Sequence, residues 1–134
     1  MESKGEARIR EILSENHLIF EKEYSPPGLL GFRGKPLRYD FAVFNKDMQI
    51  DFLIEYDGKQ HFEYIEFFSK NKQKWDYMRE MDVRKNKYAL MSKIPLYRIP
   101  YIDFEKLNSL QDILQEKYLV KTKWDTTLWQ KNKN

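Results

Sequence analysis

The sequence predicts an α/β protein in which helices flank a partly antiparallel sheet. Two apolar runs joined by a short polar turn, at 37–44 and 48–57, are typical of a β-hairpin. A charged stretch rich in helix-forming residues covers about 69–91, and a short apolar run at 94–99 follows it. The chain has 134 residues, of which 41% are hydrophobic and 16% aromatic, so it has enough apolar material for one folded domain. The alternation of strand-like and helix-like segments favours a layered α/β sandwich.

The first predicted element is a helix from Ser3 to about His17. Ser3 can cap it, and Glu6 stands three residues on, in the spacing of a capping box. Ile9 and Leu13 lie on its apolar stripe, and Glu6 falls on the same side. Glu6 is therefore either a capping-box glutamate or a residue of a functional site.

A strand at 18–24 and a glycine-rich basic loop at 28–36 precede the hairpin. In the strand at 37–44, Asp40 and Ala42 share one face with Phe44. Pairing with the strand at 48–57 would let Asp40 and Glu55 approach each other, depending on the register.

The second half of the chain predicts a long helix, a short strand and a last helix. Asp82 and Lys85 fall on the same side of the long helix as Met78 and Ala89. Asp103 is expected to cap the last helix, which would run to about Tyr118. We expect the single domain to cover 1–120 and a basic, aromatic tail to cover 121–134. Trp124 and Trp129 in this tail either stack on bases or, as we prefer, pack on the domain or on a second subunit.

Composition narrows the classes of function. A net charge of +3 permits a nucleic-acid partner without requiring one. The absence of cysteine excludes disulfides, thiolate zinc sites and cysteine nucleophiles. No apolar run approaches the length of a membrane span, and the first residues lack the apolar stretch of a signal peptide, so no membrane partner and an intracellular location are expected.

The run from Leu53 to Phe62 is the most informative part of the sequence. Glu55 and Asp57 lie two residues apart at the end of an apolar strand, so they share a face. Two acids on one buried strand end repel each other and lose solvation unless a cation or a proton lies between them. Mg²⁺ and Mn²⁺ prefer such carboxylate ligands. The alternative is a salt-bridged strand end in which Asp57 and Gly58 form an ordinary turn.

Polar residues around these acids suggest hydrolytic chemistry. Lys59, Gln60, His61 and Lys85 could hold an attacking water, carry a proton or neutralise a developing anion. His61 is also explained as a packed, hydrogen-bonded residue beside Phe62.

The combined pattern resembles a known nuclease superfamily. Tyr39-Asp40-Phe41 stands about fifteen residues before the Glu55 run, and Asp82 with Lys85 and then 96–99 follow. Together they resemble the PD-(D/E)XK nucleases, and within them the very-short-patch-repair-like endonucleases and certain phage homing endonucleases. The resemblance spans roughly Gly5 to Tyr101. It implies a restriction-endonuclease-like α-β-β-β-α-β core, with a mixed sheet flanked by helices.

The resemblance also implies roles for individual residues. Asp40 would be the central metal ligand and Glu55 the acid of the second strand, supported by Asp57. Glu6 would match the first-helix glutamate, His61 the histidine near the attacking water, and Asp82 the later acid on the helix.

Two departures from the family pattern stand out. Tyr39 occupies the position of the family's proline, and Asp57 that of its lysine. Lys59, Gln60 or Lys85 would replace that lysine, or the chain would rely on His61. An inactive member is the remaining alternative.

The expected function is therefore that of a Mg²⁺- or Mn²⁺-dependent endonuclease that nicks or cuts DNA, in the cytoplasm or nucleoid, or encoded by a virus and acting in its host. A metal-dependent RNA nuclease and a non-catalytic DNA-binding member of the fold are the alternatives. Either a homodimer or an accessory specificity protein is a further expected partner. Lysines near a helix N-terminus oppose the helix dipole, which phosphate binding would explain. The candidate DNA contacts are Arg33, Lys35, Arg38, Lys59, Lys70, Lys72 and Lys74.

Overall fold

The computed structural model of the protein describes residues 2–58 and 72–125. The strands are β1 (Ile19–Tyr24), β2 (Tyr39–Phe44), β3 (Ile50–Asp57) and β4 (Leu96–Pro100). The α-helices are α1 (Lys4–Glu15), α3 (Lys72–Met91) and α4 (Leu110–Ile113). Three short 3-10 helices complete the described chain: η1 (Phe32–Gly34), η2 (Tyr101–Lys106) and η3 (Glu116–Tyr118).

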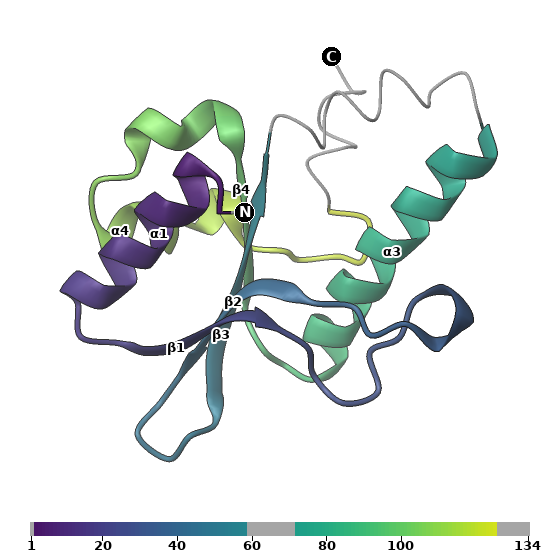
Figure 1. Ribbon diagram of the computed structural model, residues 1–134, viewed down its shortest axis with the longest axis horizontal. Coiled ribbons are helices and arrows are strands. Elements are labelled where there is room, and N and C mark those ends of the chain that lie inside the picture. The colour runs from purple at the N-terminus through teal and green to yellow at the C-terminus, as the bar shows by residue number, and fades with distance from the viewer. Residues whose placement is uncertain (1, 59–71, 126–134) are drawn as a thin grey trace.

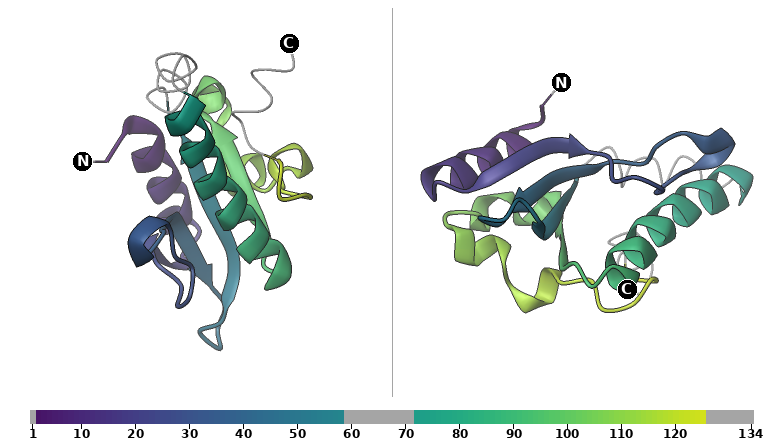
Figure 2. Two further views of the ribbon diagram at one scale, coloured as in Figure 1. Left: turned by 90° about the vertical axis from the view of Figure 1, so that its right-hand side faces the viewer. Right: turned by 90° about the horizontal axis from the view of Figure 1, so that it is seen from below.

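The four strands form one mixed sheet with helices on both faces. The strand order is β1-β2-β3-β4, with β1–β2 and β2–β3 antiparallel and β3–β4 parallel. Helices α1 and α4 cover one face and α3 covers the other (Figure 1). Seen from the α3 side, that helix lies in front of the sheet (Figure 2). The predicted α/β class with a mixed, helix-flanked sheet is confirmed.

The predicted hairpin is also confirmed, and its register positions the acids. Phe41 pairs with Ile54, so the next position along brings Asp40 opposite Glu55. Oδ1 of Asn45 closes the turn by accepting hydrogen bonds from the N–H groups of Asp47 (2.9 Å) and Gln49 (3.0 Å). This Asx-type turn fixes the offset between the two strands.

Each face of the sheet has its own apolar core. Ile9, Ile12 and Leu13 of α1 pack with Phe41 and Ile54, as the helix periodicity predicts. On the other face, Ala89 of α3 packs with neighbours from three strands, which are Ala42, Leu53 and Leu96. Because side chains alternate along a strand, Asp40 and Glu55 share the α3 face with Ala42 and Leu53.

Gly5 allows the first turn of α1 to lie directly against the sheet. A Cβ atom at this position would come within 2.0 Å of Cζ of Tyr56. Any larger residue would therefore displace the Tyr56 ring or the helix.

The prediction of one last helix from Asp103 to about Tyr118 is wrong. The chain forms η2, α4 and η3 there instead. Arg8 of α1 donates from Nε to the carbonyl oxygen of Leu107 (2.9 Å), a group that a continuous helix would have used internally. Ser109 and Asp112 form a capping box of their own, which starts α4 at Leu110. Asp103 accepts a hydrogen bond from the Tyr118 hydroxyl (2.6 Å).

Within residues 2–58 and 72–125, no helix is both long enough and apolar enough to cross a membrane.

Candidate functional site

Asp40 and Glu55 form a reciprocal pair where the β2–β3 ladder ends. The N–H of Asp40 donates to Oε1 of Glu55 (2.9 Å). The N–H of Tyr56 donates to Oδ2 of Asp40 (2.7 Å). Each carboxylate thus accepts a backbone N–H from the neighbouring strand, which fixes both side chains. The sequence suggested this approach, and the structure brings the two acids together.

The pair is electrostatically unfavourable when both groups are charged. Glu55 is only 6% exposed. Burial and the neighbouring charge of Glu55 raise the pKa of Asp40 well above its usual range. The Tyr56 N–H and Lys85 act in the opposite direction but do not offset these two effects. The protein therefore holds a carboxylate in a place that disfavours its ionised form.

Lys85 of α3, the helix that covers this face of the sheet, reaches the Asp40–Glu55 pair. Its Nζ lies 3.2 Å from Oε2 of Glu55. The hydroxyl of Tyr39 donates to the backbone carbonyl of Lys85 (2.7 Å), which ties α3 to the start of β2. Tyr39 therefore helps to position this lysine.

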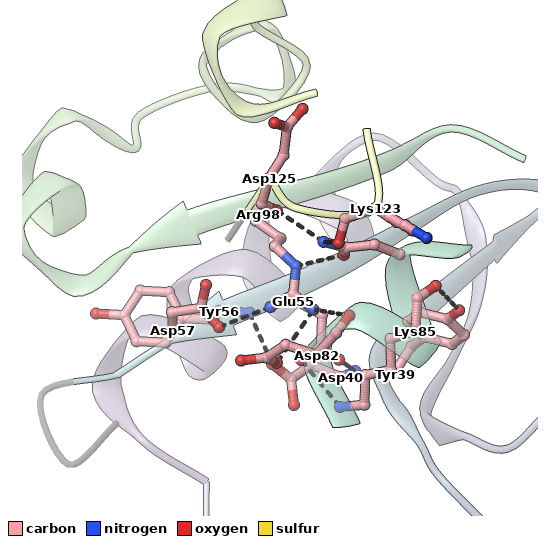
Figure 3. A network of polar contacts seen from close by, with 11 residues as sticks. Tyr39, Asp40, Glu55, Tyr56, Asp57, Asp82, Lys85, Arg98, Lys123 and Asp125 are labelled. Atoms are coloured by element: carbon pink, nitrogen blue, oxygen red, sulfur yellow. Dashed lines mark hydrogen bonds and ion pairs between the residues drawn. The ribbon is translucent and has the colours of Figure 1, made fainter. Parts of the chain in front are cut away.

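Arg98 of β4 gathers the other two acids of this face. Its Nη1 lies 3.3 Å from Oδ1 of Asp57, and its Nη2 lies 3.2 Å from Oδ1 of Asp82 (Figure 3). Burial alone would lower the pKa of Arg98, but Asp82 and Asp57 outweigh it and raise that pKa. Asp57 thus contacts a buried guanidinium, as the salt-bridged alternative expects. Residues 2–58 and 72–125 contain no group of three or more acids or histidines that could hold a metal ion.

Asn86 connects this network to the C-terminal segment. Its Oδ1 accepts from Nε of Arg98 (2.9 Å), and its Nδ2 donates to the carbonyls of Lys123 (3.2 Å) and Asp125 (2.8 Å). Residues 121–125 therefore contact the folded domain rather than extending away from it. The Trp124 ring lies 5.5 Å from Cζ of Arg79 on α3, so it contacts the domain while it stays 49% exposed.

Sequence reasoning missed Arg98 and Asn86 as members of the site. Arg98 belongs to the motif at 96–99, where it stands within an apolar strand. Because arginine is seldom buried without a charged partner, its place there could have indicated an ion pair in the site. Its position beside Glu55 follows from the parallel register, which no local pattern specifies.

Glu6 fulfils the capping role. Its Oε1 accepts from the N–H of Ser3 (3.1 Å), and Oγ of Ser3 accepts from the N–H of Glu6 (3.2 Å). The Glu6 charge also contributes to the raised pKa of Asp40, although α1 covers the opposite face of the sheet.

The predicted basic loop is anchored to α3 and exposes its cations. Arg84 donates to the carbonyl of Leu30 (2.9 Å), and the Phe32 ring lies 4.7 Å from that of Tyr77. Arg33 and Lys35 are exposed on this loop, and Arg38, two residues after it, is exposed as well. Lys59, Gln60, His61 and Lys70 lie outside the described residues, as do the side chains of Lys72 and Lys74.

No protein-family model matches the chain, and no curated protein or solved structure matches it significantly.

Proposed function

We propose that this protein is a metal-dependent endonuclease that hydrolyses DNA phosphodiester bonds. The observation that supports this most directly is the Asp40–Glu55 pair, two inward-facing carboxylates held side by side at the end of β2 and β3. The element order α1-β1-β2-β3-α3-β4 agrees with the α-β-β-β-α-β core that the motif resemblance implies, which supports a restriction-endonuclease-like topology.

The donor set fits a divalent metal. The site brings together four acids and two cations, namely Asp40, Glu55, Asp57 and Asp82 with Lys85 and Arg98. These six side chains carry a net charge of −2 when all of them are ionised. Mg²⁺ commonly takes one or two carboxylates from the protein and completes its shell with waters and substrate phosphate. Asp40 and Glu55 would hold Mg²⁺ or Mn²⁺. The bound ion would stabilise phosphate charge and lower the pKa of a bound water.

The protein's own residues would orient the reaction. The N–H groups of Asp40 and Tyr56 fix the two carboxylates, so they do not need to reorganise when substrate binds. Lys85 brings a positive charge to the edge of this pair, where it would face the negative charge that develops on the phosphate. Arg98 holds Asp57 and Asp82 in place beside the pair. Gln60 and His61 remain the candidates for handling the water or the leaving group.

The basic loop gives the substrate a separate binding surface. Arg33, Lys35 and Arg38 would contact backbone phosphates, which position DNA without reading its sequence.

Incubation of supercoiled plasmid with Mg²⁺ tests the proposal. We expect wild type to nick or linearise the plasmid and Asp40→Asn to lose at least about 100-fold in rate, since one preorganised charge contact contributes this much. Asp51→Asn is the matched control, because Asp51 is an exposed acid on β3, the strand that carries Glu55, and it should retain activity. Intact plasmid together with metal-independent DNA binding would instead favour the non-catalytic alternative. Cleavage of RNA but not of DNA would favour the RNA nuclease.

A further inference from the structure

A pocket of about 440 Å³ lies at the same end of the sheet as the candidate site, on the α1 side. Its lining comes from the end of β3, the first turn of α1 and the 3-10 helix η2. Its volume falls in the range of about 300–1,000 Å³ that is common for small-molecule sites. The side chains that decide its chemistry are Tyr56, Tyr101, Phe104 and Lys4.

The pocket is linked to the carboxylate pair through β3. Tyr56 follows Glu55, so its ring points to the opposite face of the sheet, while its N–H holds Oδ2 of Asp40. Asp57 pairs with Pro100 in the parallel register, so η2 begins level with the end of β3. A ligand in the pocket would be separated from Asp40 and Glu55 by the end of β3.

The lining combines ring faces with a positive charge. Tyr101 and Phe104 are only half-buried, although both face the pocket. Nζ of Lys4 lies 4.4 Å from the centroid of the Phe104 ring, which places an ammonium group at the aromatic wall. Ile102 is 70% exposed at the rim, and Glu105 brings an acid to the same lining. Aromatic rings beside a lysine suit a nucleobase that stacks while a neighbouring phosphate of the same strand pairs with the cation.

We propose that this pocket binds an unpaired nucleobase of the DNA strand whose phosphate lies at Asp40 and Glu55. This inference rests on the proposed nuclease function and specifies its substrate. A base enters the pocket only when it has left the stack of a duplex. The enzyme therefore prefers single-stranded, frayed or branched DNA to a continuous duplex.

The test uses a single-stranded thymidine oligonucleotide with one central 2-aminopurine, and the same strand in duplex form. Binding is measured in Ca²⁺, with cleavage in Mg²⁺ measured in parallel. We expect wild type to quench 2-aminopurine emission in the single strand and to bind it at least about tenfold more tightly than the duplex. Phe104→Leu should lose the quenching and about tenfold in single-strand affinity, because the stacking ring is gone.

Phe44→Leu is the matched control, because it removes a half-buried ring that does not line the pocket. It lies at the end of β2 away from Asp40, and the variant should behave as wild type. Lys4→Gln is a second variant. Because Lys4 is exposed, this substitution should leave the folding of the protein unaffected. It should weaken single-strand binding about threefold and flatten its salt dependence by about one phosphate contact.

Undiminished quenching and affinity in Phe104→Leu, or equal affinity of wild type for the two DNA forms, would overturn the inference. If Phe104→Leu fails to fold, an unchanged salt dependence in Lys4→Gln overturns it. Plasmid cleavage that persists alongside either result would leave the nuclease function standing. Absence of both DNA binding and cleavage would remove the function and the inference together.

Discussion

The metal-free protein should become more stable when the charge of Asp40 is removed. Burial and Glu55 raise the pKa of Asp40 even though the Tyr56 N–H and Lys85 favour its charged form. The charged carboxylate is therefore destabilising on balance in the folded state. Asn at this position keeps an oxygen for the Tyr56 N–H, which lies 2.7 Å from Oδ2 in the wild type. We expect Asp40→Asn to stabilise the metal-free protein at neutral pH.

Two opposing contributions set the size of the effect. Replacing a charge-assisted hydrogen bond by a neutral one costs about 1 kcal/mol. The relief of desolvation and of repulsion from Glu55 exceeds this cost, because the net direction of the pKa change already includes the hydrogen bond. A net gain of about 1–2 kcal/mol at pH 7.5 is typical of such relief, and it corresponds to roughly 3–10 °C in Tm for a domain of this size.

The pH dependence has a defined sign. Above the ordinary carboxyl pKa of 3.8, the unfolded chain releases the Asp40 proton while the folded chain retains it. The wild type then loses stability as pH rises through the window up to the raised pKa, because the folded state binds more protons than the unfolded state. Asp40→Asn lacks this loss. Its advantage should be absent near pH 3.8 and below, grow with pH, and level off above the raised pKa.

Thermal unfolding followed by circular dichroism in EDTA, from pH 4 to pH 8, measures this difference. Asp51→Asn should stay within about 0.5 kcal/mol of wild type, since Asp51 is exposed. Glu55→Gln should gain less than Asp40→Asn, because it removes the partner of Lys85 at 3.2 Å. A Tm of Asp40→Asn below that of wild type at pH 7.5, or a difference that does not change with pH, would refute the reasoning.

Three further predictions concern the surrounding residues. Arg98→Met should lower the free energy of unfolding in urea by about 3–5 kcal/mol, because it leaves Asp57 and Asp82 without their buried guanidinium. The control Arg38→Met removes an exposed ion pair of 3.9 Å and should change this free energy by less than about 1 kcal/mol, and equal effects of the two variants would contradict the buried network. Lys85→Met should reduce the plasmid cleavage rate about 100-fold or more while Mn²⁺ affinity stays within about tenfold of wild type, and parallel loss of both would instead make Lys85 necessary for the metal site itself. Gly5→Ala should lower stability by about 1–3 kcal/mol through its clash with the Tyr56 ring, and a cycle with Tyr56→Leu should recover most of this loss; an additive double variant would contradict the close approach.

The parts of the fold that local patterns specify could be predicted from sequence. The capping box at Ser3 and Glu6, the hairpin and the inward side of α3 depend on residues a few positions apart, and the structure contains all three. The approach of Asp40 to Glu55 follows from the same hairpin once its turn has fixed the register.

The parts that depend on distant contacts could not be predicted. Arg8 donates to the carbonyl of Leu107, 99 positions away, at the point where the expected last helix is interrupted. The parallel pairing of β3 with β4 brings Arg98 beside Asp57. Asp57 shares a strand face with Glu55, as alternation predicts, but it forms an ion pair with this guanidinium. Both outcomes depend on tertiary packing, which overrides local preference.

Direct titration of Mn²⁺, followed by electron paramagnetic resonance of the free ion, tests the central claim that Asp40 and Glu55 bind a divalent metal. The account predicts one Mn²⁺ per chain that excess Mg²⁺ displaces, with affinity at least about tenfold weaker in Asp40→Asn and unchanged in Asp51→Asn. Absence of Mn²⁺ binding by the wild type, or equal binding by wild type and Asp40→Asn, would contradict it.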